Sequence, residues 1–460
     1  MEKKLKNRVI LALVVMTAVC FSALLPFAVK EHKLNAAQAR AVATLDENAD
    51  NYNAGTIVLS DTTREEAEKL SEKLGAKLRI TSDGSYAALR LPDGVTIDDV
   101  VRSGDYREYV DKFSPDFYTR ISDITEEEES VAGEGRKPEK PEYSVSDTLY
   151  KNQTYIDYVN IGAAWNTYKG SGVTVAVIDT GIDTDHIEFA GRISEYSYNA
   201  TTDKIVKDYA KEDGTYDWSI IEDEQGHGTS VAGVVAAGMN GEGVVGIAPE
   251  VTLLVIKAES DENGAFRSTA DLVFGLNYAV ERNADIVNMS FGAYTPTNPF
   301  ARATRLAVDS DVICVAAAGN DATSALCYPA ADENVIAVGA LKENGNELAE
   351  YSNFGENSDV VAPGTTFTTK RGGGYGVSTG TSLASPIVAG AMALLKNSNQ
   401  YIEFEQAREL LYASCYDLGA KGDDWYFGYG AIDVSALTVE QRGTVTFDML
   451  TDEIEDIEQK

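Results

Sequence analysis

Basic residues are scarce in this chain of 460 residues, which has 39 lysines and arginines against 73 aspartates and glutamates. The formal net charge of -34 gives a surface that repels nucleic acid and anionic lipid, which excludes both as binding partners. We interpret the acidic excess as a means of staying soluble. The alternative interpretation of the acidic excess is a preference for cationic substrates.

Cysteine is also rare, with four residues that lie far apart in the chain. Cys20 belongs to an N-terminal apolar run, and the other three lack the spacing of a metal site, so neither a metal centre nor a disulfide framework is implied. Cys314 lies in the apolar run 312–318, and we expect it to be a small buried hydrophobe. Neither Cys314, Cys327 nor Cys415 lies in a motif that resembles that of a cysteine nucleophile.

The N-terminus has the pattern of an export signal, with a basic leader before an almost unbroken apolar run at residues 9–29. The run exceeds a typical signal core and is long enough to span a bilayer. Ala-Gln-Ala at residues 37–39 would serve as a cleavage site, although it lies far from the run. Residues 1–39 are therefore a signal peptide or a membrane anchor, with lipidation at Cys20 a third and poorly matched option. The protein is expected to be secreted or held at the cell surface.

The pattern of residues 50–125 predicts a small α+β unit of the ferredoxin-like type. A capping box of Thr62 with Glu65 begins a helix that ends at Gly75, and a second helix begins near Thr96. The unit contains no histidine, and we interpret it as a propeptide or an inhibitor-like module. The expected strands are 56–60, 77–81 and 85–91.

A composition change separates this unit from the rest of the chain. Residues 126–147 form an acidic linker without periodicity, of the kind in which proteolytic nicking concentrates. Residues 148–440 alternate apolar runs with helix-compatible segments, which indicates one α/β domain whose parallel sheet has helices on both faces. No function is predicted for the acidic tail 441–460. The expected strands are 173–178, 251–258, 286–289, 312–318 and 335–338, and the expected helices are 230–237, 269–281, 300–309 and 385–395.

His227 is the best candidate for a catalytic base among only three histidines. A lone histidine is more often structural, but His227 lies between Gly226 and Gly228 at the start of a helix-like segment. Flanking glycines allow substrate and backbone to approach the imidazole closely. This frame favours a functional role.

Asp179 ends an expected strand and is followed by Thr180 and Gly181. The carboxyl ends of parallel strands are where such sheets bind ligands. Asp-Thr-Gly alone also suggests an aspartic protease, which needs a second copy to share a proton. This chain has no second copy, and a homodimer that supplied one would leave the histidine and serine motifs unexplained.

Ser382 lies where an apolar helix begins, with Pro386 acceptable only in its first turn. A serine in that place has its backbone N–H and the positive end of the helix directed at developing negative charge. The alternative role is that of a helix N-cap, for which Ser385 is the better candidate. Asn320 follows an expected buried strand and could donate its amide to an oxyanion, although alone it would be interpreted as a turn residue.

Together, residues 177–183, 226–233 and 380–386 resemble the subtilisin-like serine peptidases, in the chain order Asp, His, Ser. The resemblance covers residues 150 to 440 and implies a serine endopeptidase that needs no cofactor for its chemistry. Its implied catalytic roles are carried over from the family: Ser382 attacks the scissile carbonyl, His227 transfers the proton and Asp179 orients His227. Asn320 and the Ser382 N–H would hold the oxyanion.

The same resemblance implies how substrate binds. Ser290, Phe291 and Gly292 match the segment whose backbone pairs with an extended substrate, beside Gly319. Cys327 stands where small members often have glycine, at the base of the specificity pocket. The stretch of 47 residues between Asp179 and His227 is longer than in the smallest members, and we expect its polar segment 203–224 to be a surface insertion near the cleft.

Family members often bind structural calcium through a loop after the histidine helix. Residues 238–244 have the matching length and keep Asn240, while Glu188 stands where aspartate is usual. Calcium requires six to eight oxygen ligands, many of them from backbone. Glu188 and Asn240 are therefore the candidate calcium ligands.

The resemblance also gives residues 50–125 a role, because family precursors carry a prodomain that assists folding and blocks the active site until it is cut off. We expect a monomer whose partners are protein or peptide substrates and its own prodomain. A broadly acting endopeptidase and a dedicated maturation protease for one secreted peptide both fit. A catalytically inactive binding module is the alternative from another class, and the complete set of catalytic residues argues against it.

Cys327 at the base of the pocket predicts a cleavage preference. A side chain in place of glycine makes the pocket smaller, so bulky aromatic residues should be disfavoured before the scissile bond. Profiling of peptide-library cleavage measures this preference directly. Dominance of Phe or Tyr at that subsite would contradict it.

Overall fold

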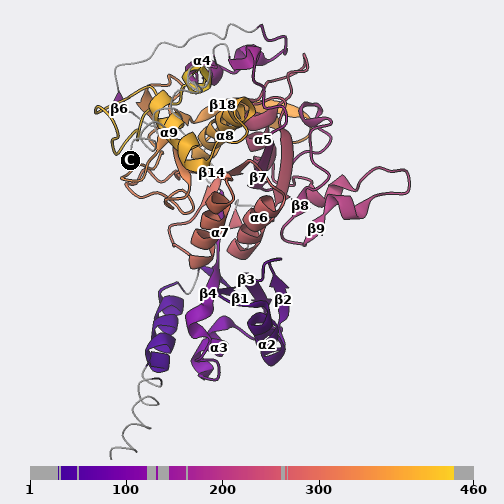
Figure 1. Ribbon diagram of the computed structural model, residues 1–460, viewed down its shortest axis with the longest axis vertical. Helices are drawn as coiled ribbons and strands as arrows, with labels where there is room; N and C mark the ends of the chain where they lie inside the picture. The colour runs from indigo at the N-terminus through magenta and orange to yellow at the C-terminus, as the bar shows by residue number, and fades with distance from the viewer. Residues whose placement is uncertain are drawn as a thin grey trace, which may run out of the picture. The chain divides into compact units, whose positions relative to one another are not determined.

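The computed structural model describes residues 30, 33–48, 51–121, 131–132, 144–161, 164–260, 265–266 and 268–439 (Figure 1). The chain divides into two compact units, Met1–Phe117 and Tyr118–Lys460. The apolar run with Cys20, most of the linker 126–147 and the tail 441–460 lie outside the described residues. Among the helices that are described, none combines the length and apolar character needed to cross a bilayer.

The first unit is a four-stranded antiparallel sheet in the order β2-β3-β1-β4. Its core contains buried Ile57 and Leu89 from the sheet and Leu70 and Val101 from helices. The predicted order of strand, helix, hairpin and helix is confirmed. The elements are β1 (Tyr52–Ser60), α2 (Arg64–Leu74), β2 (Lys77–Ile80), β3 (Tyr86–Arg90), α3 (Ile97–Ser103) and β4 (Phe113–Phe117).

The predicted helix ends in this unit are correct with one exception. Gly75 is the left-handed C-cap of α2, and Thr96 caps α3. The capping box of α2 is formed by Thr63 with Glu66, one residue later than predicted. The Thr62 hydroxyl donates instead to the carbonyl of Thr63, so it does not cap the helix.

The second unit is built on a ten-stranded, mostly parallel sheet, as predicted. Strand β7 lies in its middle, paired in parallel with β10 and β12. Antiparallel pairing is confined to the two ends of the sheet. The strands are β6 (Val131–Ala132), β7 (Thr174–Asp179), β8 (Tyr198–Asn199), β9 (Lys204–Ile205), β10 (Thr252–Lys257), β12 (Ile286–Met289), β14 (Ile313–Ala317), β15 (Ile336–Leu341), β16 (Glu347–Leu348) and β17 (Val360–Pro363).

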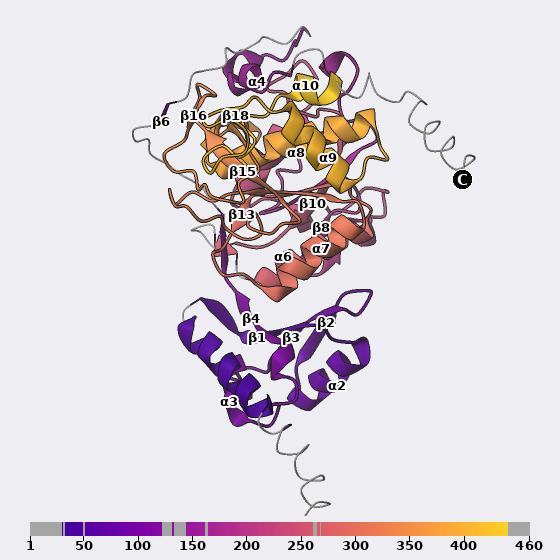
Figure 2. The same ribbon diagram turned by 60° about the vertical axis from the view of Figure 1, so that its left-hand side comes forward.

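Helices cover both faces of this sheet, so the predicted α/β fold class is confirmed. Figure 2 shows α8 on one side of the strands and α6 and α7 on the other. Helix α5 packs against α8 and against the hairpin β18–β19. The helices are α4 (Tyr155–Tyr158), α5 (His227–Ala236), α6 (Thr269–Glu281), α7 (Asn298–Asp309), α8 (Thr381–Ser398), α9 (Phe404–Ser414) and α10 (Val434–Val439), and the hairpin is β18 (Thr365–Lys370) and β19 (Gly374–Thr379).

Two predictions about this unit are wrong. Helix α8 begins at Thr381 after Gly380, so Ser385 is not its N-cap and Pro386 lies inside the helix rather than in its first turn. The stretch 203–224 is not wholly a surface insertion, because it ends in buried Ile221 and Asp223. These residues are buried because the chain at Ile182 pairs with Glu222 in a parallel bridge.

Candidate active site

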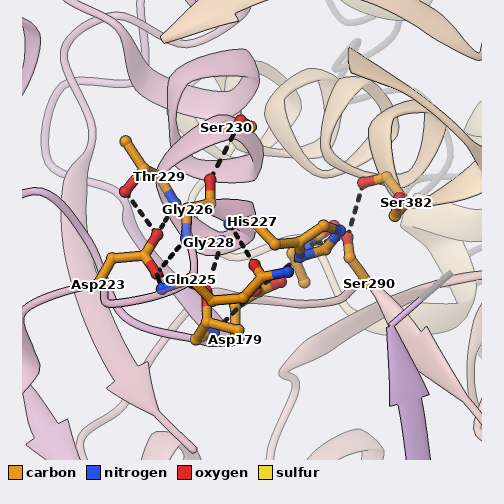
Figure 3. Close-up of polar contacts among 12 residues, drawn as sticks. Asp179, Asp223, Gln225, Gly226, His227, Gly228, Thr229, Ser230, Ser290 and Ser382 are labelled. Carbon is orange, nitrogen blue, oxygen red and sulfur yellow. Dashed lines mark hydrogen bonds and ion pairs between the residues drawn. The ribbon is translucent and has the colours of Figure 1, made fainter. Parts of the chain in front are cut away.

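Asp179 and His227 are in contact at the carboxyl end of the central strand β7. Asp179 is the last residue of β7, and its Oδ1 atom lies 2.7 Å from His227 Nδ1 (Figure 3). A carboxylate only accepts, so the imidazole N–H donates in this bond. Burial raises the pKa of Asp179, and the neighbouring His227 opposes that rise. The Thr180 N–H also donates to Oδ1, at 2.7 Å, and helps to hold the carboxylate.

The glycines around His227 allow helix α5 to approach β7. His227 is the first residue of α5, and Gly226 before it has φ 104°, a backbone angle that favours glycine. A Cβ atom on Gly228 would lie 2.2 Å from the Gly181 carbonyl oxygen. The close approach expected from the glycine frame is therefore present, and at Gly228 it leaves no room for a side chain.

Asp223 is a site residue that the sequence analysis missed. Its side chain is fully buried and accepts N–H bonds from Gly226 and Thr229, at 2.7 and 2.8 Å. It also accepts the hydroxyl of Thr180, which in turn accepts the Gly228 N–H. Asp223 therefore ties the first turn of α5 to the end of β7. Its place four residues before His227 is the available signal, but its polar neighbours at 203–224 favour a surface insertion instead.

Ser382 is the second residue of α8 and is fully buried. Helices α5 and α8 pack against each other, and Figure 3 shows His227 and Ser382 on these facing helices. Asn320 lies beside the start of α8, where its Oδ1 accepts the N–H and the hydroxyl of Thr381, both at 2.9 Å. Because the carbonyl end of the amide faces Thr381, its NH₂ end is the part that can donate to another group.

The predicted substrate segment lies in a small separate sheet. Strand β5 (Thr119–Ile121) runs between β11 (Ala265–Phe266) and β13 (Phe291–Gly292), antiparallel to both. The Thr119 hydroxyl also hydrogen-bonds that of Thr269, at 2.9 Å. The chain thus already supplies an extended strand alongside Phe291 and Gly292.

Cys327 packs against Gly292 and Gly319, the two glycines of the predicted substrate site. A Cβ atom on Gly292 would lie 2.4 Å from Cys327 Cβ, and one on Gly319 would lie 2.8 Å from its sulfur. Burial raises the pKa of the Cys327 thiol to about 11, so it is protonated at neutral pH. Cys327 is therefore packed closely against both glycines and is a poor nucleophile.

Glu188 and Asn240, the candidate calcium ligands, lie together with a residue that we had not predicted. Asn240 Nδ2 donates to Glu188 Oε2 at 3.0 Å, and Asp147 Oδ1 accepts the Asn240 N–H at the same distance. Burial raises the pKa of both carboxyl groups, and Asp147 Oδ2 is buried without a hydrogen-bond partner. An unpartnered carboxylate oxygen beside a second buried carboxylate suits a cation.

The fit for calcium depends on oxygen atoms other than carboxylates. No group of three or more His, Cys, Asp and Glu side chains suited to a metal exists within the described ranges. Calcium accepts backbone and amide oxygens, so Asp147 and Glu188 would need such groups from the loop that contains Asn240. With oxygens from that loop completing the ligand set, the residues present fit a calcium ion.

The arrangement has the parts for acyl transfer. A buried carboxylate holds an imidazole, a serine begins the facing helix, and amide donors lie beside it. Sequence reasoning identified these residues because each lies in a local motif. The supporting carboxylates Asp147 and Asp223 act through backbone contacts that such motifs do not reveal.

Comparisons with known proteins agree with one another. Residues 170–430 match the family described as the subtilase family. The chain is 41% identical over 238 residues to the major intracellular serine protease of Bacillus subtilis, a match that covers 50% of this chain and 70% of that protein. It is 36% identical over 280 residues to subtilisin DY of Bacillus licheniformis, covering 58% and 92%. Fervidolysin of Fervidobacterium pennivorans, a keratinolytic enzyme related to subtilisin, shares the fold, with a TM-score of 0.72 at 23% identity over 86% of this chain and 62% of that one.

Proposed function

The chain belongs to the subtilase family and is a serine endopeptidase, and from this premise we propose that Ser382, His227 and Asp179 are its catalytic triad. The observation that carries the proposal is the hydrogen bond from His227 Nδ1 to Asp179 at the end of β7. It fixes the tautomer in which Nε2 is the basic nitrogen. The same serine motif begins α8, the helix that packs against the histidine helix.

Each residue has one task in the proposed reaction. His227 takes the hydroxyl proton of Ser382 as the serine oxygen attacks the scissile carbonyl, and then gives the proton to the leaving amine. The Asp179 carboxylate stabilises the charged imidazole. The Asn320 amide and the Ser382 N–H donate to the oxyanion, where the positive end of α8 adds to the stabilisation. In the second half of the reaction, His227 takes a proton from water as the water oxygen attacks the acyl carbon, and then returns the proton to Ser382 as the acyl group leaves.

Substrate is proposed to bind as an added strand on Phe291 and Gly292. Strand β5 supports this, because it pairs with both residues through its own backbone. The same strand suggests self-inhibition in a precursor, since Thr119–Ile121 would occupy the position of a substrate strand. The unit before it then acts as the prodomain, and the cut that releases it falls in the chain that follows Ile121.

Export remains a proposal based on the N-terminal apolar run. One relative is named as a minor extracellular protease of Bacillus subtilis, which suits secretion, and another is named as intracellular. Buried Asp147 and Glu188 support a structural calcium ion held with oxygens of the loop that contains Asn240. Such an ion would neutralise two desolvated carboxylates and has no part in the chemistry.

Ser382 should be the site of covalent labelling by a serine-directed fluorophosphonate. We expect Ser382→Ala to abolish labelling and His227→Ala to slow it by orders of magnitude, because the hydroxyl needs a base. Intact-mass measurement after incubation reads out the reaction. Ser414→Ala, a buried helical serine far along the chain, is the matched control and should label at the wild-type rate. Retained labelling of Ser382→Ala would overturn the triad, and absence of labelling in the wild type would support an inactive binding module.

Maturation should depend on the same serine. Active wild-type protein should begin at a residue between 126 and 148, whereas Ser382→Ala should retain the whole precursor. N-terminal sequencing and mass analysis of both proteins measure this difference. Active enzyme with an intact linker would exclude the maturation scheme.

Calcium should stabilise the folded chain through Asp147. In the Ser382→Ala background, which prevents self-digestion, millimolar calcium should raise Tm by several degrees because the ion binds the native state only. Asp147→Asn should remove most of that rise. Asp213→Asn, which changes an exposed carboxylate, is the control and should keep it. A Tm that does not respond to calcium in any of these proteins would argue against the site.

A further inference from the structure

A proline lies four residues after Ser382, inside helix α8. In an α-helix the N–H of each residue donates to the carbonyl four residues earlier. Pro386 has no N–H, so the usual bond from residue 386 to the carbonyl of Ser382 cannot form. Ser382 is fully buried, and water is therefore a poor substitute. A donor from another element can replace the bond that proline removes.

Ser290, which lies between β12 and β13, supplies such a donor. Its hydroxyl donates to the Ser382 carbonyl oxygen at 2.8 Å, the bond that Figure 3 draws between these residues. The Ser290 oxygen also accepts from Asn288 Nδ2 at 2.9 Å, and Asn288 Oδ1 accepts the hydroxyl of Ser385 at 2.8 Å. The chain of three bonds therefore starts and ends on α8, at Ser382 and at Ser385, which directly precedes Pro386.

The direction of every bond in this chain is determined by chemistry. A carbonyl oxygen only accepts, so Ser290 must use its single hydrogen on Ser382. Its oxygen must then accept from the NH₂ end of Asn288, which turns the carbonyl end of that amide to Ser385. Ser290, Asn288 and Ser385 are all fully buried, so a broken bond would leave a polar group without water. The network is polarised in one sense and has no second arrangement of equal energy.

We propose that Asn288 and Ser290 are positioning residues that hold the backbone of Ser382 in place of the helical bond that Pro386 removes. The resemblance to the family implies only a backbone role for Ser290, in substrate binding. Its side chain has a different role, because it donates to the Ser382 carbonyl. Ser290 also directly precedes Phe291 and Gly292, the residues proposed to pair with substrate. One residue thereby couples the substrate strand to the nucleophile. This inference rests on the proposed catalytic role of Ser382.

The test removes the hydroxyl and then restores the helical donor. Ser290→Ala should slow labelling of Ser382 by a fluorophosphonate about three- to tenfold, as loss of one buried hydrogen bond predicts. The kcat for a peptide substrate should fall by the same factor with KM unchanged, since the backbone of β13 remains. In the double variant Ser290→Ala, Pro386→Ala, the new N–H can donate to the Ser382 carbonyl, so most of the loss should be recovered. Pro386→Ala alone provides the reference for this cycle.

Two further variants separate positioning from a general effect on folding. Ser385→Ala removes the far end of the chain and should cause a smaller loss of kcat, again without a change in KM. Ser414→Ala also deletes a buried serine hydroxyl bonded to a helical carbonyl, and should leave kcat unchanged. An unchanged rate in Ser290→Ala, a loss confined to KM, or a double variant as slow as Ser290→Ala would overturn the proposal. If the wild type itself failed to label, the proposed function would be wrong rather than this inference.

Discussion

The hydrogen bond between Asp179 and His227 is the contact on which the rest of the site depends. It joins the end of a strand to the start of a helix, so its 2.7 Å length requires that β7 and α5 approach more closely than side chains usually permit. Gly228 permits that approach, and buried Asp223 holds it by accepting backbone N–H groups from the turn before α5 and from its first residues. A carboxylate that is buried at such cost is stable only when its donors are fixed.

The parallel sheet explains why residues from distant segments meet here. The central strands β10, β7, β12, β14 and β15 run in the same direction, so the loops after β7, β12 and β14 emerge at one edge. Asp179 ends β7, Ser290 follows β12, and Asn320 lies shortly after β14. The two helices that carry His227 and Ser382 pack together on one face, and their first residues approach that edge. The fold thus brings the residues proposed as triad and oxyanion donor to a single region.

Much of this could be predicted from the sequence, because strands and helices of the catalytic unit follow local apolar patterns and the three motifs are contiguous. The errors arose where a partner comes from elsewhere. Thr63 rather than Thr62 caps α2, and the difference depends on where the preceding turn ends. Ser385 has the composition of a helix cap, but its hydroxyl bonds to Asn288, which is distant in sequence. Asp147 was overlooked because its contacts are backbone N–H groups of a loop far along the chain.

Strand β5 is covalently continuous with the sheet that it joins, and this connection sets the strength of any competition for β11 and β13. A segment on a short tether has an effective concentration on the order of millimolar at its own binding site. A free peptide must exceed that concentration, or bind far better, to displace it. Once the tether is cut, the same strand becomes an ordinary bimolecular ligand whose occupancy falls with dilution. Cutting the tether would then act as the switch, because dilution lowers the occupancy of the released strand without any change in the contacts themselves.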